Sequence, residues 1–190
     1  MAMTEPIRNK NHLQQLIMYY FNHGNMRNYL LIILCVHTAL RISDILKLST
    51  NDVYDFRNHR VRRTITITEK KTGKSQTIAL HKSIIAALSA CFPSAKPGTP
   101  LICNKRTSKA ISRIQAYRLI RSAAEDINLP QRVSCHSLRK TFGYHSWKSG
   151  VSPAVIMEIY NHSSLKVTKR YLGVSQDDKN AVYLGLCFAA

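Results

Sequence analysis

The most restrictive feature of this sequence is an apolar segment near its N-terminus. Residues 26–38 have helical spacing, and between Tyr29 and Val36 the apolar side chains cover nearly the whole circumference of that helix. A helix that is apolar all round is stable only when other elements cover it on every side. We therefore expect this helix to lie in the core.

The rest of the chain is mostly helical in pattern, with one exception. Residues 61–68 alternate with period two, and 76–80 form a second short strand beyond a turn that holds Gly73; this pattern predicts a β-hairpin. The fold class is thus mainly α (α+β), a helical core with a small β-hairpin at one edge. Ser108 and Ser152 are the expected N-caps of two helices, the second with Pro153 at its first position. Further helices are expected at 11–22, 43–47, 82–91, 109–127, 136–149, 153–160, 164–172 and 177–188.

Charge points to the kind of partner. The 190 residues include 28 Lys and Arg against 10 Asp and Glu, a formal net charge of +18. Such an excess favours a polyanion, and its spread along the chain favours a folded binding surface over a basic tail. Charge alone leaves open an RNA binder, a membrane-surface binder and a merely soluble basic protein.

Several classes are disfavoured. The five cysteines contain no C-x-x-C pair, so no zinc framework is expected. No segment has the layout of a signal peptide or the length of a membrane span. We expect a cytoplasmic protein with reduced thiols, no metal and no membrane partner.

Three groups of residues carry side chains that could take part in a chemical reaction. His136 and Arg139 are three positions apart at the start of a predicted helix, which places them on one face; alone, this spacing also fits an ordinary solvated surface. Arg41 directly follows the most apolar helix, where its charge requires an anion, either a bound phosphate or a carboxylate such as Asp44. His162 and Tyr171 complete the set.

Four segments together resemble the signature motifs of tyrosine recombinases, which include phage integrases and Xer-type resolvases. They are residues 39–46, 70–74, 136–142 and 161–171, in that order, and the resemblance spans roughly 26–175. The fold implied is the tyrosine-recombinase catalytic domain. One departure is Tyr160-Asn161, where relatives usually carry Leu-Gly.

The resemblance implies a role for each residue. Arg41 and Arg139 are the paired arginines of the site, and Asp44 supports the first. Lys71 is chosen as the active-site lysine over Lys70 and Lys74 because it directly precedes Thr72-Gly73. His136 and His162 are the site histidines, and Tyr171 is the nucleophile. The residues expected to contact DNA are Arg41, Lys70, Lys71, Lys74, Arg139, Lys140, Lys169 and Arg170.

Physical chemistry makes these roles coherent. Two guanidiniums can hold the non-bridging oxygens of a phosphodiester and stabilise the charge of its transition state without a metal. Tyrosine has a pKa near 10, so Tyr171 needs a base, for which His136 is the candidate. Lys71 would protonate the leaving 5′-oxygen, and His162 would bind a phosphate oxygen. The product is a 3′-phosphotyrosine, formed with no cofactor and no ATP.

The leading hypothesis is a site-specific DNA recombinase or integrase, a strand transferase. The alternatives are a non-catalytic DNA-binding regulator derived from a recombinase, and a relaxing enzyme like a type IB topoisomerase. A regulator would be expected to lack one or more site residues.

The expected organisation is a single catalytic domain over residues 1–190, with no N-terminal core-binding domain. It comprises an N-terminal helix in 1–24, a catalytic core at 25–175 and a tail at 176–190 that is exchanged between subunits. The expected partners are double-stranded DNA and further copies of the chain, as a dimer or tetramer on DNA, with no small-molecule substrate. We expect association with the nucleoid.

The resemblance implies a separate helical N-terminal domain that completes a clamp around DNA, and we expect this chain to lack it. We therefore predict weak and strongly salt-dependent binding to duplex DNA. The dissociation constant should rise by about a hundredfold or more between roughly 50 and 200 mM salt, because cations are displaced from each contacted phosphate. A fluorescence-anisotropy titration at several salt concentrations measures this. Low-nanomolar affinity that hardly changes with salt would contradict it.

Overall fold

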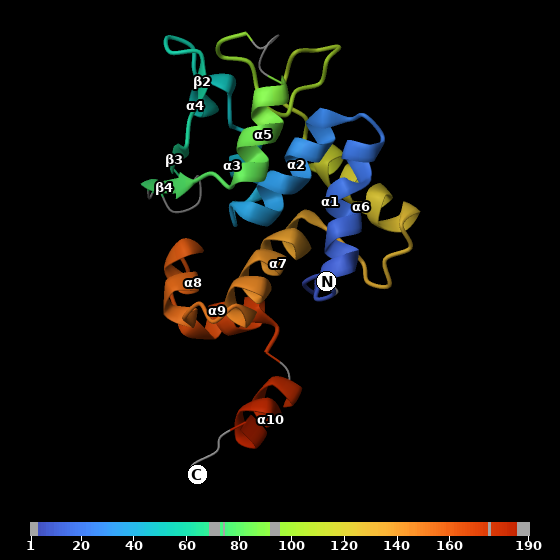
Figure 1. Ribbon diagram of the computed structural model, residues 1–190, viewed down its shortest axis with the longest axis vertical. Helices are drawn as coiled ribbons and strands as arrows, with labels where there is room; N and C mark the ends of the chain where they lie inside the picture. Colours follow the sequence, from blue (N-terminus) through green and yellow to red (C-terminus); the bar gives the residue numbers. More distant parts are fainter. Residues whose placement is uncertain (1–3, 69–72, 74, 92–95, 175, 186–190) are drawn as a thin grey trace.

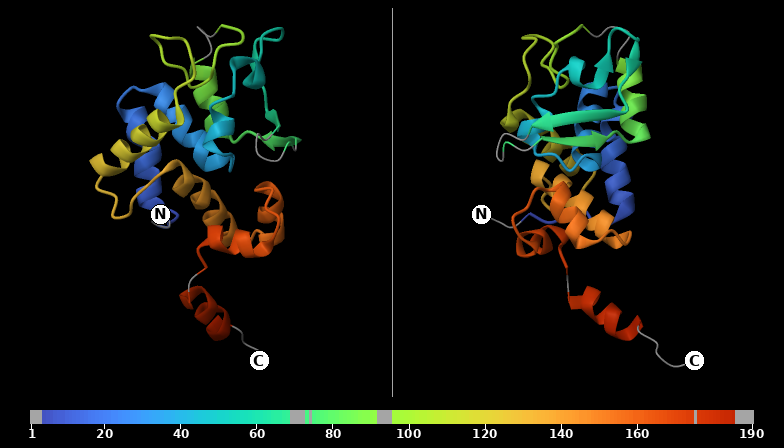
Figure 2. Two further views of the ribbon diagram at one scale, coloured as in Figure 1. Left: turned by 180° about the vertical axis from the view of Figure 1, so that it is seen from behind. Right: turned by 90° about the vertical axis from the view of Figure 1, so that its left-hand side faces the viewer.

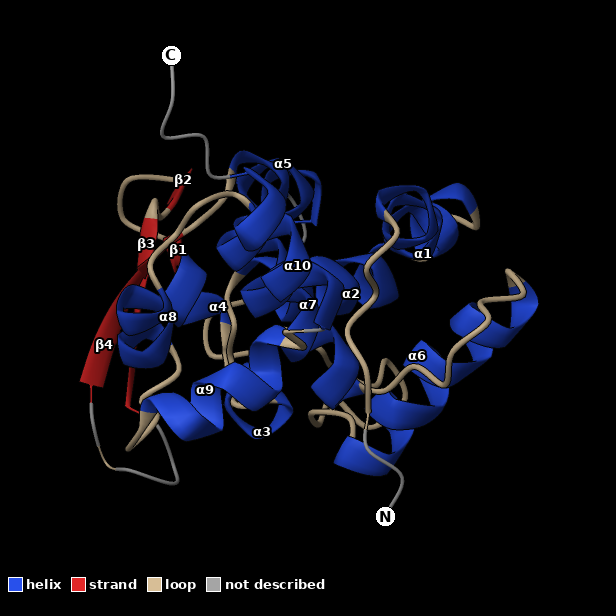
Figure 3. Ribbon diagram, turned by 90° about the horizontal axis from the view of Figure 1, so that it is seen from below, coloured by secondary structure: helices blue, strands red, loops and turns tan. Residues whose placement is uncertain are grey.

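The computed structural model describes residues 4–68, 73, 75–91, 96–174 and 176–185. Helices make up most of the described chain, and the strands lie together at one side, away from α1 and α6 (Figure 3). The expected fold class, mainly α with a small hairpin at one edge, is therefore confirmed. The elements are α1 Lys10–Asn22, α2 Met26–His37, α3 Ile42–Ile45, α4 Thr50–Val53, β1 Tyr54–Asp55, β2 Arg60–Val61, β3 Thr64–Thr68, β4 Ser75–Ala79, α5 Lys82–Cys91, α6 Arg113–Asp126, α7 Cys135–Lys148, α8 Pro153–Ile159, α9 Leu165–Leu172 and α10 Gln176–Gly185.

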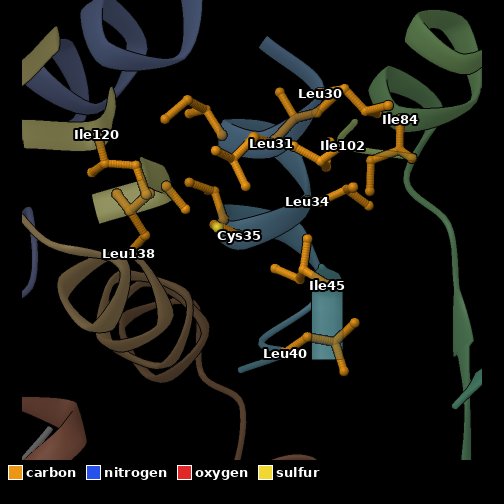
Figure 4. Close-up of a cluster of buried hydrophobic side chains, with 14 of the residues drawn as sticks. Leu30, Leu31, Leu34, Cys35, Leu40, Ile45, Ile84, Ile102, Ile120 and Leu138 are labelled. Carbon is orange, nitrogen blue, oxygen red and sulfur yellow. The ribbon is translucent and has the colours of Figure 1, made fainter. Parts of the chain in front are cut away.

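The apolar helix α2 is the centre of the core, as its sequence predicts. Every residue from Leu30 to Val36 is buried, and α2 contacts α1, α5, α6 and α7 (Figure 1). In Figure 4 its side chains reach Leu138 of α7 on one side and Ile84 of α5 on the other. The helix that carries His136 and Arg139 is thus packed directly on the most buried element of the chain.

The β region differs from the prediction in one respect. The single strand expected at 61–68 is interrupted: β2 pairs with β1, whereas β3 pairs with β4 from Thr64↔Ala79 to Thr68↔Ser75. The interruption falls where the Arg62 backbone N–H donates to the Val53 carbonyl at 2.8 Å and turns the chain. The expected hairpin is confirmed (Figure 2, right), and Gly73 in its turn has a φ of +68° that favours glycine.

Helix starts follow their capping residues. The Ser152 side chain accepts from the Ala154 N–H and Pro153 opens α8, as predicted. The predicted N-cap of α6, Ser108, was wrong. Ser112 caps that helix and accepts from the Gln115 N–H at 3.1 Å. Ser108 instead has a φ of +55° in a preceding turn, a conformation that cannot cap a helix. The short helix α4, with its capping box, was not predicted.

The C-terminal third forms a second, smaller cluster. α8 and α9 pack on each other and on α7, whereas α10 projects away from the rest (Figures 1 and 2). Lys148 of α7 forms an ion pair with Asp178 of α10. Three apolar side chains of α10 are largely exposed: Val182 (60%), Tyr183 (77%) and Leu184 (87%). Within the described residues, no helix has both the length and the apolar character needed to span a bilayer.

Candidate active site

The start of α7 places two of the predicted site residues. Ser134 caps the helix by accepting from the Ser137 N–H at 3.2 Å, and the Ser137 hydroxyl in turn accepts from the Ser134 N–H. This cap sets the first turn, so that His136 lies at the exposed start of the helix while Arg139, one turn later, is buried. Arg139 is only 3% exposed and His136 remains exposed to solvent.

Arg139 joins three separate parts of the chain. One terminal nitrogen of its guanidinium donates to the Ala39 carbonyl at the end of α2. The other donates to the Tyr160 carbonyl at the end of α8, at 3.0 Å. The position of the guanidinium is therefore set by the main chain, which pre-organises the charge of Arg139.

Tyr171, on α9, meets both predicted histidines. Its ring centroid is 5.0 Å from that of His136 and 4.5 Å from that of His162, both edge to face. The His162 ring is oriented by Thr168, whose hydroxyl lies 3.0 Å from Nδ1 and which is fully buried. Residues from α7, the α8–α9 turn and α9 therefore lie together around Tyr171.

Arg41 lies at the N-terminus of α3, one turn before Asp44. Its carbonyl accepts from the Asp44 N–H at 2.8 Å, and the Asp44 side chain is 1% exposed. The charge of Arg41 is close enough to His136 to lower the pKa of that imidazole. Arg41 thus belongs to the same electrostatic environment as His136 and Arg139.

The other basic residues predicted to contact DNA divide into three cases. Lys70, Lys71 and Lys74 lie outside the described residues, although β3 and β4, which flank them, are described. Lys169 and Arg170 are exposed on α9. Lys140 is buried: its ammonium donates to the Thr4 carbonyl at 2.6 Å and lies 5.6 Å from the centroid of the Tyr171 ring.

The N-terminal segment, residues 4–8, is part of the surroundings of the site, which the sequence did not indicate. Ile7 is fully buried, and its N–H donates to the Thr141 hydroxyl of α7 at 2.9 Å. Arg8 donates to the Gly173 carbonyl, just beyond Tyr171, at 3.3 Å. The segment therefore ties α7 to the end of α9.

Electrostatics favour a neutral imidazole beside the tyrosine. Partial desolvation, followed by the positive charges of Lys140, Arg139 and Arg41, lowers the pKa of His136 from its ordinary 6.5. Desolvation also lowers the pKa of Lys140, against the opposing charge of Glu5. A neutral imidazole can accept a proton, and the nearby cations favour an anionic ligand such as a phosphate diester.

Two residues that contact the predicted site residues were not predicted from the sequence. Thr168 has no local signal, because its contact with His162 depends on how α9 packs. Tyr160 is fully buried, and the one sequence signal for it is its departure from the usual Leu. Among the described residues, no group of three or more His, Cys, Asp or Glu side chains is arranged to hold a metal ion.

Known proteins resemble this chain in both sequence and fold. The family model described as "Phage integrase family" matches residues 9–177. The "Probable integrase/recombinase YoeC" of Bacillus subtilis (strain 168) is 38% identical over 183 residues, covering 96% of this chain and 97% of that protein. The "Tyrosine recombinase XerD" of Mycobacterium leprae is 28% identical over 170 residues, covering 84% of this chain and 52% of that protein. The chain thus spans nearly all of one relative and about half of the other.

Solved structures share the fold. The "Crystal structure of XerA recombinase" superposes with a TM-score of 0.78 at 18% identity, covering 97% of this chain and 64% of that one. A XerH site-specific recombinase bound to its palindromic difH substrate gives a TM-score of 0.73 at 20% identity, covering 93% of this chain and 52% of that one. That XerH structure is a post-cleavage complex. At these identities the likeness shows the fold alone.

The packing of Gly143 against Tyr160 yields a prediction. A Cβ at position 143 would lie 2.5 Å from the Tyr160 hydroxyl oxygen and 3.0 Å from the ring. Gly→Ala in a helix normally stabilises by about 1 kcal/mol. Here we expect Gly143→Ala to lower the free energy of unfolding by about 1–3 kcal/mol, because the ring is buried and must shift. Urea denaturation measures this.

The double variant Gly143→Ala/Tyr160→Phe serves as the control. Phenylalanine removes the hydroxyl oxygen, the nearest of the clashing atoms, so adding Ala at 143 should cost less there than in the wild type. An equal or larger cost in the Phe background, or a more stable Gly143→Ala protein, would contradict the packing described.

Proposed function

The chain belongs to the phage integrase family, and on that premise we propose that it is a site-specific recombinase that cuts and rejoins double-stranded DNA. The reaction passes through a 3′-phosphotyrosyl intermediate with Tyr171 as the nucleophile. The observation that carries the proposal is the convergence of Tyr171 with His136, His162 and the buried Arg139.

The Tyr171 hydroxyl oxygen attacks the scissile phosphorus and its proton passes to His136, whose lowered pKa supports the neutral, accepting form. Arg41 and Arg139 stabilise the negative charge on the non-bridging oxygens, and His162 donates a further hydrogen bond. The phosphorus–O5′ bond breaks, and a lysine of the hairpin turn, Lys71 in preference to Lys70 or Lys74, protonates the leaving oxygen.

Rejoining is the reverse of cleavage. A 5′-hydroxyl attacks the phosphotyrosine, and Tyr171 leaves as the protonated phenol. The intermediate retains the energy of the phosphodiester bond, so neither ATP nor another cofactor is needed. Arg41, Asp44, His136, Arg139, His162 and Tyr171 are all present, which speaks against a regulator that has lost its chemistry.

DNA binding and assembly belong to the same proposal. The exposed Lys169 and Arg170 on α9 are assigned to the DNA backbone. Lys140, which was expected to contact DNA, is assigned a supporting role beneath Tyr171, because its ammonium is buried and bound to the Thr4 carbonyl. The tail at 176–190, with exposed apolar side chains on α10, is assigned to a neighbouring copy within a dimer or tetramer on DNA. Residues 1–190 act as one catalytic domain, in the cytoplasm and on the nucleoid.

The role of Tyr171 as nucleophile can be tested by removing its hydroxyl oxygen. Tyr171→Phe should abolish the covalent protein–DNA adduct, lowering its rate of formation by at least about a thousandfold, because no other group replaces the lost oxygen. A nicked suicide duplex bearing the target sequence traps the adduct for gel analysis. Tyr144→Phe, the same change on α7 outside the site, should form adduct at the wild-type rate. Adduct formation by Tyr171→Phe would refute the proposal.

The lowered pKa of His136 determines how cleavage should depend on pH. The pKa of His136 lies below 6.5, so the base stays neutral at neutral pH and is lost only as the pH falls through a value below 6.5. The single-turnover cleavage rate should therefore hold at pH 6.5–7 and decline at lower pH. His136→Gln should slow cleavage by roughly a hundredfold and remove this acidic limb. An acidic limb that survives in His136→Gln would assign it to another group.

A further inference from the structure

Tyr160 occupies an unusual place beneath the site. It is the C-cap of α8, is fully buried, and is the largest of the fully buried side chains in the described chain. It belongs to the small cluster formed with Ala39, Ile156 and Leu172 under Tyr171. A buried phenol at this point has to satisfy its hydroxyl within the protein.

We propose that Tyr160 is a positioning residue that holds Arg139 in register with His162 and Tyr171. The inference rests on the proposed function, since it assigns Tyr160 a part in that same site. Tyr160 acts through its neighbours and touches no reacting atom.

Tyr160 and Arg139 hold each other by three contacts. The Tyr160 hydroxyl donates to the Arg139 carbonyl at 2.6 Å, and the Arg139 guanidinium donates to the Tyr160 carbonyl at 3.0 Å. The guanidinium carbon also lies 4.5 Å from the centroid of the Tyr160 ring, a cation–π contact. Backbone and side chain of each residue are thus bound to the other, which fixes the direction of the guanidinium.

The same ring also contacts the other two groups. Its centroid lies 4.9 Å from that of His162 and 5.2 Å from that of Tyr171. One rigid side chain therefore sets the spacing between the arginine, the histidine and the nucleophile. A leucine at this position has neither the hydroxyl nor the aromatic face that makes these contacts.

Two further observations support the assignment. Gly143 on α7 leaves the room that the phenol occupies, since a Cβ there would lie 2.5 Å from the hydroxyl oxygen. Burial raises the pKa of Tyr160 above its ordinary value, so the hydroxyl keeps its proton and remains a donor. Tyr160 therefore cannot replace Tyr171 as nucleophile, because it is buried and its hydroxyl is bound to α7.

The test compares Tyr160→Phe and Tyr160→Leu with Tyr144→Phe, a matched loss of a hydroxyl on the adjacent helix. Single-turnover cleavage at saturating DNA should fall by roughly tenfold for Phe and roughly a hundredfold for Leu, because small displacements of the catalytic groups are costly. The dissociation constant for DNA should change by less than about twofold. Loss of affinity with an unchanged cleavage rate would overturn the proposal.

A double-mutant cycle separates positioning from general structure. If Tyr160 acts through Arg139, Tyr160→Phe should slow cleavage by less than about twofold in an Arg139→Ala background. The full tenfold effect in that background would show that Tyr160 acts elsewhere. Tyr160→Phe keeps the buried ring, so this arm remains informative if Tyr160→Leu fails to fold.

A measurement without DNA keeps the inference separate from the proposed activity. Nitrogen-15 NMR follows rotation about the Nε–Cζ bond of Arg139, whose signal is identified by its loss in Arg139→Ala. Tyr160→Phe should accelerate that rotation, and Tyr144→Phe should not. Unchanged rotation refutes the positioning role, whereas a wild-type protein that forms no adduct refutes the proposed function alone.

Discussion

The burial of Arg139 is the constraint on which the rest of this structure depends. A guanidinium taken out of water is stable only when its charge and donors are satisfied. Here the Ala39 and Tyr160 carbonyls provide two of the bonds, and the Tyr160 ring covers one face. Those carbonyls lie just beyond the last residues of α2 and α8, so a single side chain of α7 links the chain after α2 to the chain after α8.

These bonds explain why the site lies at the boundary between the main core and the smaller C-terminal cluster. α7 packs on the rigid helix α2 through Leu138, while its other face receives Tyr171 and Tyr160. The N-terminal segment closes the same boundary from outside, since Ile7 is bonded to α7 and Arg8 to Gly173. Groups that would share one phosphate are therefore carried by elements whose relative positions are held at several independent points.

Hydrophobic periodicity and capping residues predicted the helices whose formation depends on neighbouring residues. The apolar circumference of α2 predicted a core helix, and the Ser152-Pro153 pair predicted the start of α8. The start of α6 was mistaken, because Ser108 and Ser112 offer the same capping chemistry. A tertiary hydrogen bond decided between them. The Ile111 N–H donates to the Ile102 carbonyl at 3.0 Å, which keeps the chain before Ser112 extended.

The sequence by itself determined the residues from which the proposed site is built, namely the arginines, histidines and tyrosine and their order, together with the core helix and the basic charge. Only the tertiary structure decided that Lys140 is buried against Thr4, that Thr168 orients His162 and that Tyr160 holds Arg139. Most of these contacts join residues far apart along the chain, 136 positions for Lys140 and Thr4 and 21 for Tyr160 and Arg139. Periodicity and caps act within a few residues, so such contacts follow from packing alone.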